Sequence, residues 1–430
     1  VIFRSAGQGG QFRMGENQSR DFEMTAGKLR IVELTEYQTR SLREDELAEE
    51  IGRAIHTFYG KQIAVQPPSF LTDRCWQLTS QGWVGYIPLT DAFHLSLVPK
   101  VPVANLFRML EYAYRLDFTI LEGLMDSESI TELYERLALV LAKRVLDRIR
   151  RGAYRSYVPQ NDYLPYIRGR IDVMDHVRNL QRVALPCNFE EHTADLEENQ
   201  ILLWTLTRIL ESGICTERSL PHIRQARRAL LGLTTLQPFS ARACSNRLYN
   251  RLNQDYEPLH ALCRFFLEHI GPTHRLGNHR MLPILIDMDR LFELFVVEWL
   301  RKHVPARYSV LGQENVQFHM GHIVSISIDI TVEDLETGQT VFVLDTKYKA
   351  AASPAAADLE QVVAYAEAKG CTRAALIYPT ELACPISGFW GRDISVRSLA
   401  FRLDGDIEES GHRLLEELRL WAESGAPGSR

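Results

Sequence analysis

The amino-acid sequence predicts a multidomain α+β protein with three successive regions of different patterning. Short apolar runs separated by polar turns, typical of strands, extend over residues 28–103. Over 104–284 the apolar positions recur three and four residues apart, as in amphipathic helices. Helical and strand-like segments then alternate over 285–422, as in an α/β domain. The polar stretches 1–27 and 423–430 are expected to be flexible tails.

The first region is predicted to form a small β-barrel or sandwich. Alternation of apolar and polar residues indicates strands, and Gly- and polar-rich turns such as 79–82 separate them. The expected strands cover residues 29–34, 62–66, 74–78, 82–88 and 94–99.

The middle region is predicted to be helical because its apolar residues fall on one face at a period of 3.6 residues. The expected helices cover residues 104–115, 129–151, 197–213, 223–233 and 256–270. An irregular stretch over 154–172 separates the second and third of these helices and contains Pro159 and Pro165.

Acidic residues in the α/β region stand on strand-like runs. Asp329 lies within Ile-Ser-Ile-Asp-Ile, and Asp345 ends an apolar run and is followed two positions later by Lys347. Because side chains alternate along a strand, Asp345 and Lys347 are expected to point to the same side. If the two strands are neighbours, the carboxylates converge. A helix follows in which Gln361 and Tyr365 share one face.

These residue types suit a magnesium-dependent hydrolysis. Mg²⁺ favours carboxylate oxygens and needs only one or two of them from the protein. The bound ion, Mg²⁺ or Mn²⁺ in its place, lowers the pKa of its water and neutralises charge on a phosphate. Lys347 would orient or help to deprotonate that water and stabilise the extra negative charge. The alternative is a surface β-hairpin, with a turn at 336–338, whose charges face water.

The order of acid, acid-x-lysine and glutamine-x-x-x-tyrosine resembles the PD-(D/E)xK nuclease fold in its RecB-like branch. The resemblance implies metal-dependent cleavage of phosphodiester bonds. Asp329 and Asp345 would hold the metal, the carbonyl of Thr346 would be a further ligand, and Gln361 and Tyr365 would support the site.

Two other positions bear on this resemblance. Ile328 stands where the family usually has a proline before the first acid, which is not a metal ligand. Upstream, residues 289–301 form an amphipathic helix that contains Glu293. In many nucleases of this group an acid on the first helix reaches the metal. The alternative is a solvated or salt-bridged glutamate.

Composition limits the cellular context. Hydrophobic content of 45% and charged content of 24% are typical of soluble globular proteins. Neither a membrane-spanning apolar run nor the apolar core of a signal peptide is present. Seven dispersed cysteines without a C-x-x-C pair disfavour zinc sites, disulfides and iron–sulfur clusters. A cytoplasmic protein is therefore expected.

The net charge of −6 is unexpected for a chain that grips DNA alone. Two local basic clusters could meet phosphates or an acidic partner, although solvated helix faces explain them equally well. The first cluster contains Lys143, Arg144, Arg148, Arg150, Arg151 and Arg155, and the second contains Arg218, Arg224, Arg227, Arg228, Arg242, Arg247 and Arg251. The overall charge suggests that another subunit supplies much of the DNA affinity.

Over residues 29–404 the chain resembles the McrC family of nuclease subunits from McrBC modification-dependent restriction systems. The segments behind this are 85–89, 95–101, 105–112, 167–172, 246–251 and 288–296, together with the nuclease motifs. The resemblance implies a subunit that inserts its N-terminal part into a GTP-specific AAA+ ring and stimulates its GTPase. The ring would recognise a 5-methylcytosine-type base in double-stranded DNA as part of antiviral defence. This chain has no G-x-x-x-x-G-K-[ST] loop, so it is expected to bind no nucleotide itself.

Arg168, Arg170 and Asp172, in Arg-Gly-Arg-Ile-Asp, are candidate partner-binding residues. The alternative is a turn in which Arg170 and Asp172 form a local salt bridge. Nuclease domains are expected to dimerise if both DNA strands are cut. Two other functions remain open: a freestanding RecB-like nuclease of another defence or repair system, and a scaffold that activates an AAA+ partner without cleaving DNA.

Overall fold

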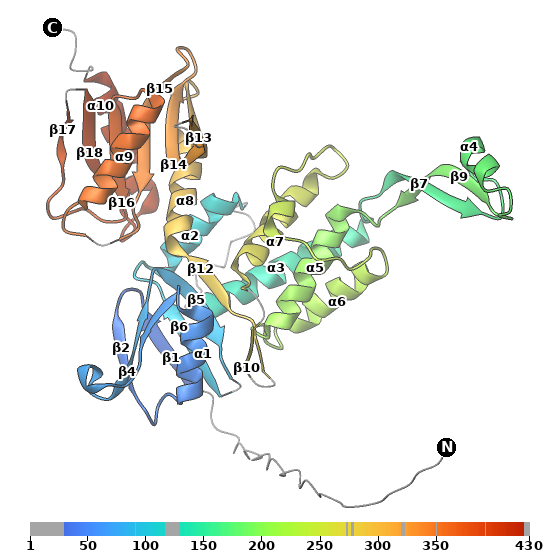
Figure 1. The fold of residues 1–430 in the computed structure, drawn as a ribbon, viewed down its shortest axis with the longest axis horizontal. Coiled ribbons are helices and arrows are strands. Elements are labelled where there is room, and N and C mark those ends of the chain that lie inside the picture. The colour runs from blue at the N-terminus through green and yellow to red at the C-terminus, as the bar shows by residue number, and fades with distance from the viewer. Residues whose placement is uncertain are drawn as a thin grey trace, which may run out of the picture.

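The computed structural model describes residues 30–90, 92–116, 129–271, 274–276, 279–319, 323–349, 351–391 and 393–424. The predicted N-terminal tail and residues 425–430 lie outside this part of the chain. Figure 1 shows a β module, a helical middle with a projecting arm, and an α/β domain on the far side of the molecule from the arm. In the described part, no helix has the length and apolar content needed to cross a membrane.

The β module consists of two sheets around one hydrophobic core. The first sheet has the order β1 (Arg30–Thr35), β6 (Phe93–Val98), β5 (Trp83–Pro88) and β12 (Ile284–Asp287). The second has the order β2 (Thr39–Arg43), β4 (Cys75–Ser80) and β3 (Ile63–Gln66), and a short 3-10 helix covers Phe70–Thr72. The five expected strands are present, shifted by one or two residues. Strand β12 joins this module although it directly precedes the first helix of the α/β domain.

The β module also contains a helix, α1 (Glu49–Tyr59), and a strand, β2, that the sequence analysis did not predict. The apolar residues Ile51, Ile55 and Tyr59 are four apart, so they lie on one helix face and pack into the core. Gly52 lets the helix approach the second sheet, because a Cβ there would stand 2.6 Å from the ring of Trp76. The expectation of an all-β region was therefore wrong at this point.

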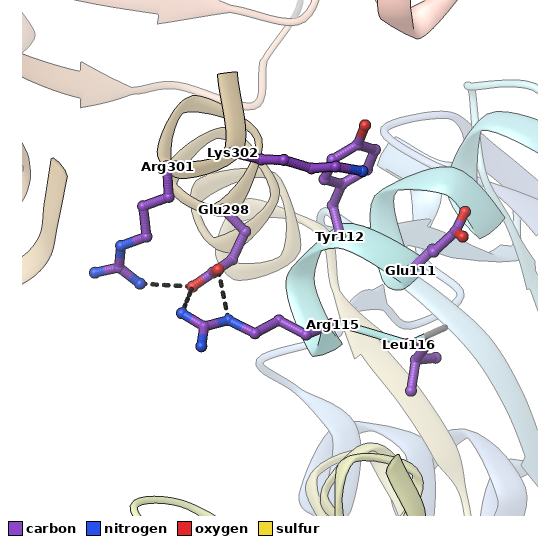
Figure 2. A pocket seen from close by; sticks show the side chains of 7 residues that line it. All are labelled: Glu111, Tyr112, Arg115, Leu116, Glu298, Arg301 and Lys302. Carbon is purple, nitrogen blue, oxygen red and sulfur yellow. Dashed lines mark hydrogen bonds and ion pairs between the residues drawn. The ribbon is translucent and has the colours of Figure 1, made fainter. Parts of the chain in front are cut away.

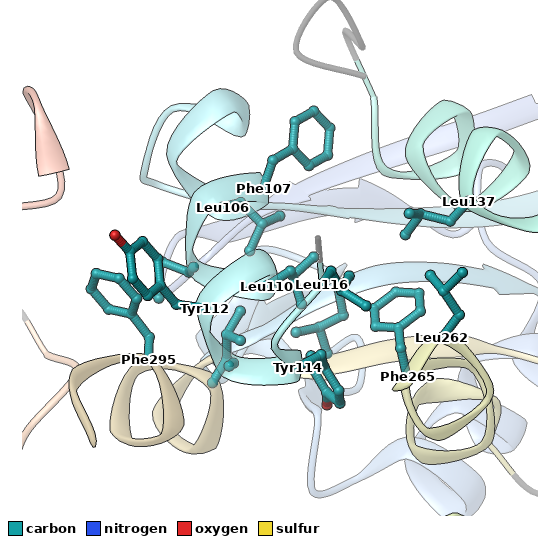
Figure 3. Close-up of a cluster of buried hydrophobic side chains, with 14 of the residues drawn as sticks. Leu106, Phe107, Leu110, Tyr112, Tyr114, Leu116, Leu137, Leu262, Phe265 and Phe295 are labelled. Carbon is teal, nitrogen blue, oxygen red and sulfur yellow. The ribbon is translucent and has the colours of Figure 1, made fainter. Parts of the chain in front are cut away.

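The middle region has the expected helices α2 (Val103–Tyr114), α3 (Ile130–Arg150), α5 (Glu197–Ser212), α6 (Leu220–Leu231) and α7 (Glu257–His269). Two 3-10 turns, Ala241–Cys244 and Gln254–Tyr256, lie between α6 and α7. Figure 3 shows that α2 is central: Leu110 and Tyr114 lie near Phe265 of α7, and Tyr112 lies against Phe295 of the α/β domain. One continuous core thus joins the helical middle to the α/β domain.

The stretch expected to be irregular, 154–172, forms the first half of the projecting arm, with strands β7 and β8. Its sheet has the order β7 (Ser156–Leu164), β9 (Leu185–Thr193) and β8 (Arg170–Ile171), and a short helix, α4 (Val173–Arg178), follows β8. Pro159 is tolerated in β7 because β7 is an edge strand that pairs only with β9. Figure 1 shows the arm pointing away from the body of the molecule.

The α/β domain is a six-stranded mixed sheet with helices on both faces. Its order is β13 (Tyr308–His319), β14 (Ile323–Asp334), β15 (Gln339–Thr346), β16 (Arg373–Tyr378), β18 (Ile394–Ala400) and β17 (Ser387–Trp390). One core lies under α9 (Ala356–Lys369), and the other lies under α8 (Met288–His303) and α10 (Ile407–Glu423). A separate two-stranded sheet pairs β10 (His274–Leu276) with β11 (His279–Met281). The helices and strands expected in this region are present.

Candidate active site

Asp329 and Asp345 are brought together by the pairing of β14 and β15. The antiparallel register ends at the pair Ile330–Leu344, so the next residues on the two strands are Asp329 and Asp345. The pairing between β14 and β15 ends at this point. The backbone N–H and the hydroxyl of Thr346 instead donate to Oδ2 of Asp329, at 3.1 and 3.3 Å. These bonds hold one carboxylate in place beside the other.

Asp345 is fully buried, with 0% of its surface exposed. Its Oδ1 accepts no hydrogen bond from the described residues, and its Oδ2 lies 2.7 Å from Nζ of Lys347. Burial raises the pKa of the Asp345 carboxyl group, and the nearby Asp329 raises this pKa further. A buried carboxylate with unused oxygen lone pairs is a position where a cation would be stabilised.

Lys347, Gln361 and Tyr365 form a short hydrogen-bonded chain. Nζ of Lys347 donates to Oε1 of Gln361 at 3.2 Å, and Nε2 of Gln361 donates to the hydroxyl oxygen of Tyr365 at 2.6 Å. Burial lowers the pKa of the Lys347 ammonium group, but Asp345 outweighs this effect and the net shift is upward. Lys347 therefore remains positively charged near neutral pH, held between a strand carboxylate and helix α9.

Glu293 on α8 faces the two aspartates. It is half-buried, and burial followed by repulsion from Asp329 raises the pKa of its carboxyl group from 4.5 to about 7. A hydrogen bond from Gln313 opposes this shift. Of the two interpretations of Glu293, the geometry favours a place among the acids of the site over a solvated surface position.

The oxygen donors at this point suit a hard divalent cation. Three carboxylates interact electrostatically with one another, and Asp345 has a buried oxygen without a hydrogen-bond partner in the described chain. Mg²⁺ and Mn²⁺ prefer such ligands over nitrogen or sulfur. Glu293, Asp329 and Asp345 would hold the ion. The carbonyl of Thr346 as a further ligand remains a prediction.

Several neighbours of the site were missed by sequence reasoning. Gln313 has a φ of +53° and lies between the β13–β14 pairs that flank Asp329, so the backbone is irregular on this side as well. Nζ of Lys349 pairs with Oδ2 of Asp358 at 2.5 Å. Asp289 has a carboxyl pKa raised to about 6 by burial and by Asp287, and Lys347 and Lys349 oppose that shift. Asp289 is four residues before Glu293, a helical spacing that the sequence did contain.

The arginine-glycine-arginine segment lies on the arm, far from the acidic site in Figure 1. Arg168 stacks on the ring of Phe189 at 4.1 Å and lies 3.8 Å from a carboxylate oxygen of Glu191. Arg170 is exposed on β8. Asp172 caps α4 by accepting a hydrogen bond from the backbone N–H of Asp175 at 3.0 Å.

Gly169, between the two arginines, has a φ of +70°, and a Cβ there would stand 2.4 Å from the carbonyl oxygen of Asn188. The glycine is therefore required by the close approach of the two strands as well as by the backbone conformation.

A pocket and a cluster of possible metal-ligating side chains lie apart from the acidic site. A hollow of about 410 Å³ lies between α2 and α8. Figure 2 shows its lining side chains, among which Arg115 and Arg301 both pair with Glu298. His303, Glu408 and His412 bring possible metal-ligating atoms within 4.8 Å of one another. Both oxygens of Glu408 already accept hydrogen bonds, from Tyr112 and Trp299, so that group has a structural explanation.

Comparisons with known proteins agree with this architecture. The type IV methyl-directed restriction enzyme EcoKMcrBC of Escherichia coli (strain K12) is 22% identical over 260 residues, covering 58% of this chain and 74% of that protein. A solved half-complex of Thermococcus gammatolerans McrB AAA+ hexamers with bound McrC includes a chain of similar fold. The match has a TM-score of 0.55 at 17% identity and covers 90% of this chain and 100% of that one. A family model described as McrBC 5-methylcytosine restriction system component matches residues 78–379, well over half of the sequence. The chain therefore belongs to the McrBC 5-methylcytosine restriction system component family.

Proposed function

We propose that this chain is the DNA-cleaving subunit of a modification-dependent restriction complex, with a magnesium-dependent endonuclease site of the PD-(D/E)xK type. The observation that supports this most strongly is the buried Asp345 carboxylate, packed against Asp329 and 2.7 Å from the ammonium group of Lys347. The single ammonium group of Lys347 does not balance the two carboxylates, so the cluster costs folding free energy unless a metal cation binds, and its presence indicates a functional role. Family membership supports the assignment to a restriction system.

Each side chain has a distinct task in the proposed hydrolysis. Asp329 and Asp345, with Glu293, would bind Mg²⁺, which when bound polarises the phosphate and acidifies a water molecule. Because Lys347 stays protonated, its role would be to orient that water and to stabilise the negative charge that develops on the phosphate oxygens. Gln361 keeps the ammonium group directed at this point, and Tyr365 anchors Gln361.

The proposed contact with an AAA+ GTPase ring is the arm, in place of the N-terminal part that the family resemblance implied. Its end exposes an apolar surface that a monomer would normally bury. The exposed fractions are 59% for Tyr166, 63% for Ile167, 64% for Val173, 67% for Met174, 60% for Val177 and 68% for Leu180. Arg168 and Arg170 lie beside this surface and would meet acidic groups or a nucleotide of the ring. The related chain of similar fold is bound to AAA+ hexamers, which supports a ring of this kind as the partner.

The proposed function is tested by incubating long DNA that contains 5-methylcytosine with this chain, its ring partner and Mg²⁺. GTP and the partner are each omitted in turn, and unmodified DNA serves as the control substrate. Cleavage that requires modification, partner and GTP is the expected result.

The two alternative functions predict different outcomes of the same assay. Cleavage without partner or GTP would indicate a freestanding nuclease. No cleavage of any DNA, together with a stimulated GTPase of the partner, would indicate a scaffold without nuclease activity and would refute the proposal.

A further inference from the structure

A buried glutamate of the β module contacts the strand end that bears the catalytic lysine. Glu36 follows β1 and is fully buried. Its Oε2 accepts hydrogen bonds from the backbone N–H of Lys100 at 2.9 Å and from the hydroxyl of Tyr348 at 3.1 Å. Tyr348 is 312 residues away along the sequence and is itself buried. The bond therefore connects two distant parts of the chain in an environment without competing water.

Tyr37 makes a second connection to the same residue. Its hydroxyl donates to the backbone carbonyl oxygen of Tyr348 at 3.5 Å. The backbone of Tyr37 has a φ of +58°, a strained value for a tyrosine, and its N–H donates to the carbonyl oxygen of Ser80 at 2.9 Å. A Cβ on Gly82 would stand 2.5 Å from the Tyr37 hydroxyl, so the neighbouring turn leaves this side chain little room.

The position of Tyr348 makes these contacts relevant to catalysis. It stands between Lys347, which contacts Asp345, and Lys349, which pairs with Asp358. Its ring lies 5.9 Å from the ring of Phe292, the residue next to Glu293 on α8. Two backbone hydrogen bonds also hold this segment: the N–H of Lys347 donates to the carbonyl oxygen of Ile377 at 2.8 Å, and the N–H of Lys349 donates to that of Lys347 at 2.9 Å. The side chain of Tyr348 therefore adds contacts to the β module that help to fix the backbone on which the two lysines sit.

We propose that Glu36 and Tyr37 are positioning residues for the nuclease site: by holding Tyr348 they fix the 347–349 segment, so that Lys347 reaches its working position only while the β module is docked on the α/β domain. The inference rests on the proposed nuclease function. It makes the β module part of the catalytic unit, and any partner that moves the module alters the rate of the chemical step.

The test uses the full chain with its ring partner and compares Tyr348→Phe, Glu36→Gln and Glu36→Ala with wild type. Tyr348→Phe removes only the hydroxyl, and loss of one buried hydrogen bond corresponds to a fall in kcat of about tenfold. The KM for DNA and the Mg²⁺ concentration at half-maximal rate are expected to stay unchanged. Glu36→Gln keeps an acceptor oxygen for the Lys100 N–H and the Tyr348 hydroxyl, so its kcat is expected to stay within about threefold of wild type. Glu36→Ala removes the acceptor, and its kcat is expected to fall about tenfold, as in Tyr348→Phe.

Tyr249→Phe is the matched control, because it removes a similar hydroxyl that lies 2.9 Å from Nδ1 of His260 in the helical middle. An equal loss of kcat in this control would overturn the proposal, since it would show a general loss of stability.

Hydrogen exchange of a peptide covering residues 345–349 provides a readout that does not depend on cleavage. Exchange is expected to be faster in Tyr348→Phe than in wild type or Tyr249→Phe. Wild-type exchange together with wild-type kcat in Tyr348→Phe would overturn the positioning role. If the wild-type chain cleaves no DNA, the nuclease proposal fails, and unchanged exchange in Tyr348→Phe would still refute the contact as a determinant of this segment.

Discussion

The carboxyl group of Asp345 is fully buried beside a second carboxylate, an arrangement that opposes folding when no cation is bound. Asp345→Asn keeps the shape of the side chain and removes the charge, while Lys347 keeps its hydrogen bond to Gln361 and the attraction of Asp329 and Asp358. We therefore expect this variant to unfold at a higher temperature than wild type in EDTA, by about 2 °C or more, while it loses DNA cleavage. Unfolding temperatures are measured in EDTA, where no metal is bound, and in Mg²⁺, where the metal compensates the wild-type carboxylates. A lower unfolding temperature in EDTA would contradict this explanation.

Glu293 gives the metal-free chain a defined pH dependence. Its carboxyl pKa rises from 4.5 to about 7 on folding, so between these values the folded chain binds a proton that the unfolded chain has released. The free energy of unfolding therefore falls as pH rises from about 4.5 to 7. Urea unfolding in EDTA at several pH values is expected to show this fall, and Glu293→Gln is expected to show a shallower one. An equal slope in both proteins would exclude Glu293 as the cause.

At the residue scale, much of the site could be predicted from the sequence because its chemistry depends on residue types at fixed spacings. Alternation along a strand placed Asp345 and Lys347 on one side, and the structure shows them 2.7 Å apart. Helical spacing placed Gln361 and Tyr365 together, and they share a hydrogen bond. Gln313 could not be found in this way, because its position depends on an irregular turn of β13 opposite Asp329.

At the scale of elements, the prediction was best where one pattern dominated. Helix α2 covers residues 103–114 where its apolar spacing predicts 104–115, and α3 begins after Ser129, whose hydroxyl accepts a hydrogen bond from the N–H of Glu132. The arm was missed because Pro159 and Pro165 indicated irregular structure. The deciding factor was position in the sheet, since an edge strand does not need every N–H for pairing.

The exposed apolar surface of the arm leads to an element-scale prediction. Val177→Asp on α4 adds a charge to a side chain that is 60% exposed, so the stability of the isolated chain is expected to change little. Binding to the ring partner and stimulation of its GTPase are expected to fall at least about tenfold, because a charge would be buried in an apolar interface. Leu420→Asp on α10, where the side chain is 53% exposed, is the matched control and should leave binding unchanged.

The Val177→Asp prediction is checked by pull-down of the ring and by GTP hydrolysis rates at fixed chain concentration. Wild-type binding and stimulation by the Val177→Asp chain would show that the ring contacts another surface.

At the scale of the whole molecule, the arm and the acidic site lie at opposite sides, and the β module and helical core connect them (Figure 1). The sequence could predict three regions but not the contacts between them. The bond from Tyr348 to Glu36 joins residues 312 positions apart, and the pairing of β12 with β5 adds a strand of the later sequence to the first module. Local sequence patterns do not encode such contacts, because each of the two segments shows its own apolar spacing whether or not the other segment is nearby.

The central claim, that the acidic cluster performs metal-dependent cleavage of DNA, is tested most directly by single-turnover cleavage rates across a range of Mg²⁺ concentrations. Wild type is compared with Asp345→Asn and Lys347→Ala, each with the ring partner and GTP. Asp345→Asn is expected to show no cleavage at any Mg²⁺ concentration. Lys347→Ala is expected to bind DNA normally and to cleave about 10²- to 10³-fold more slowly. Cleavage by Asp345→Asn at the wild-type rate would contradict the account and place the chemistry elsewhere.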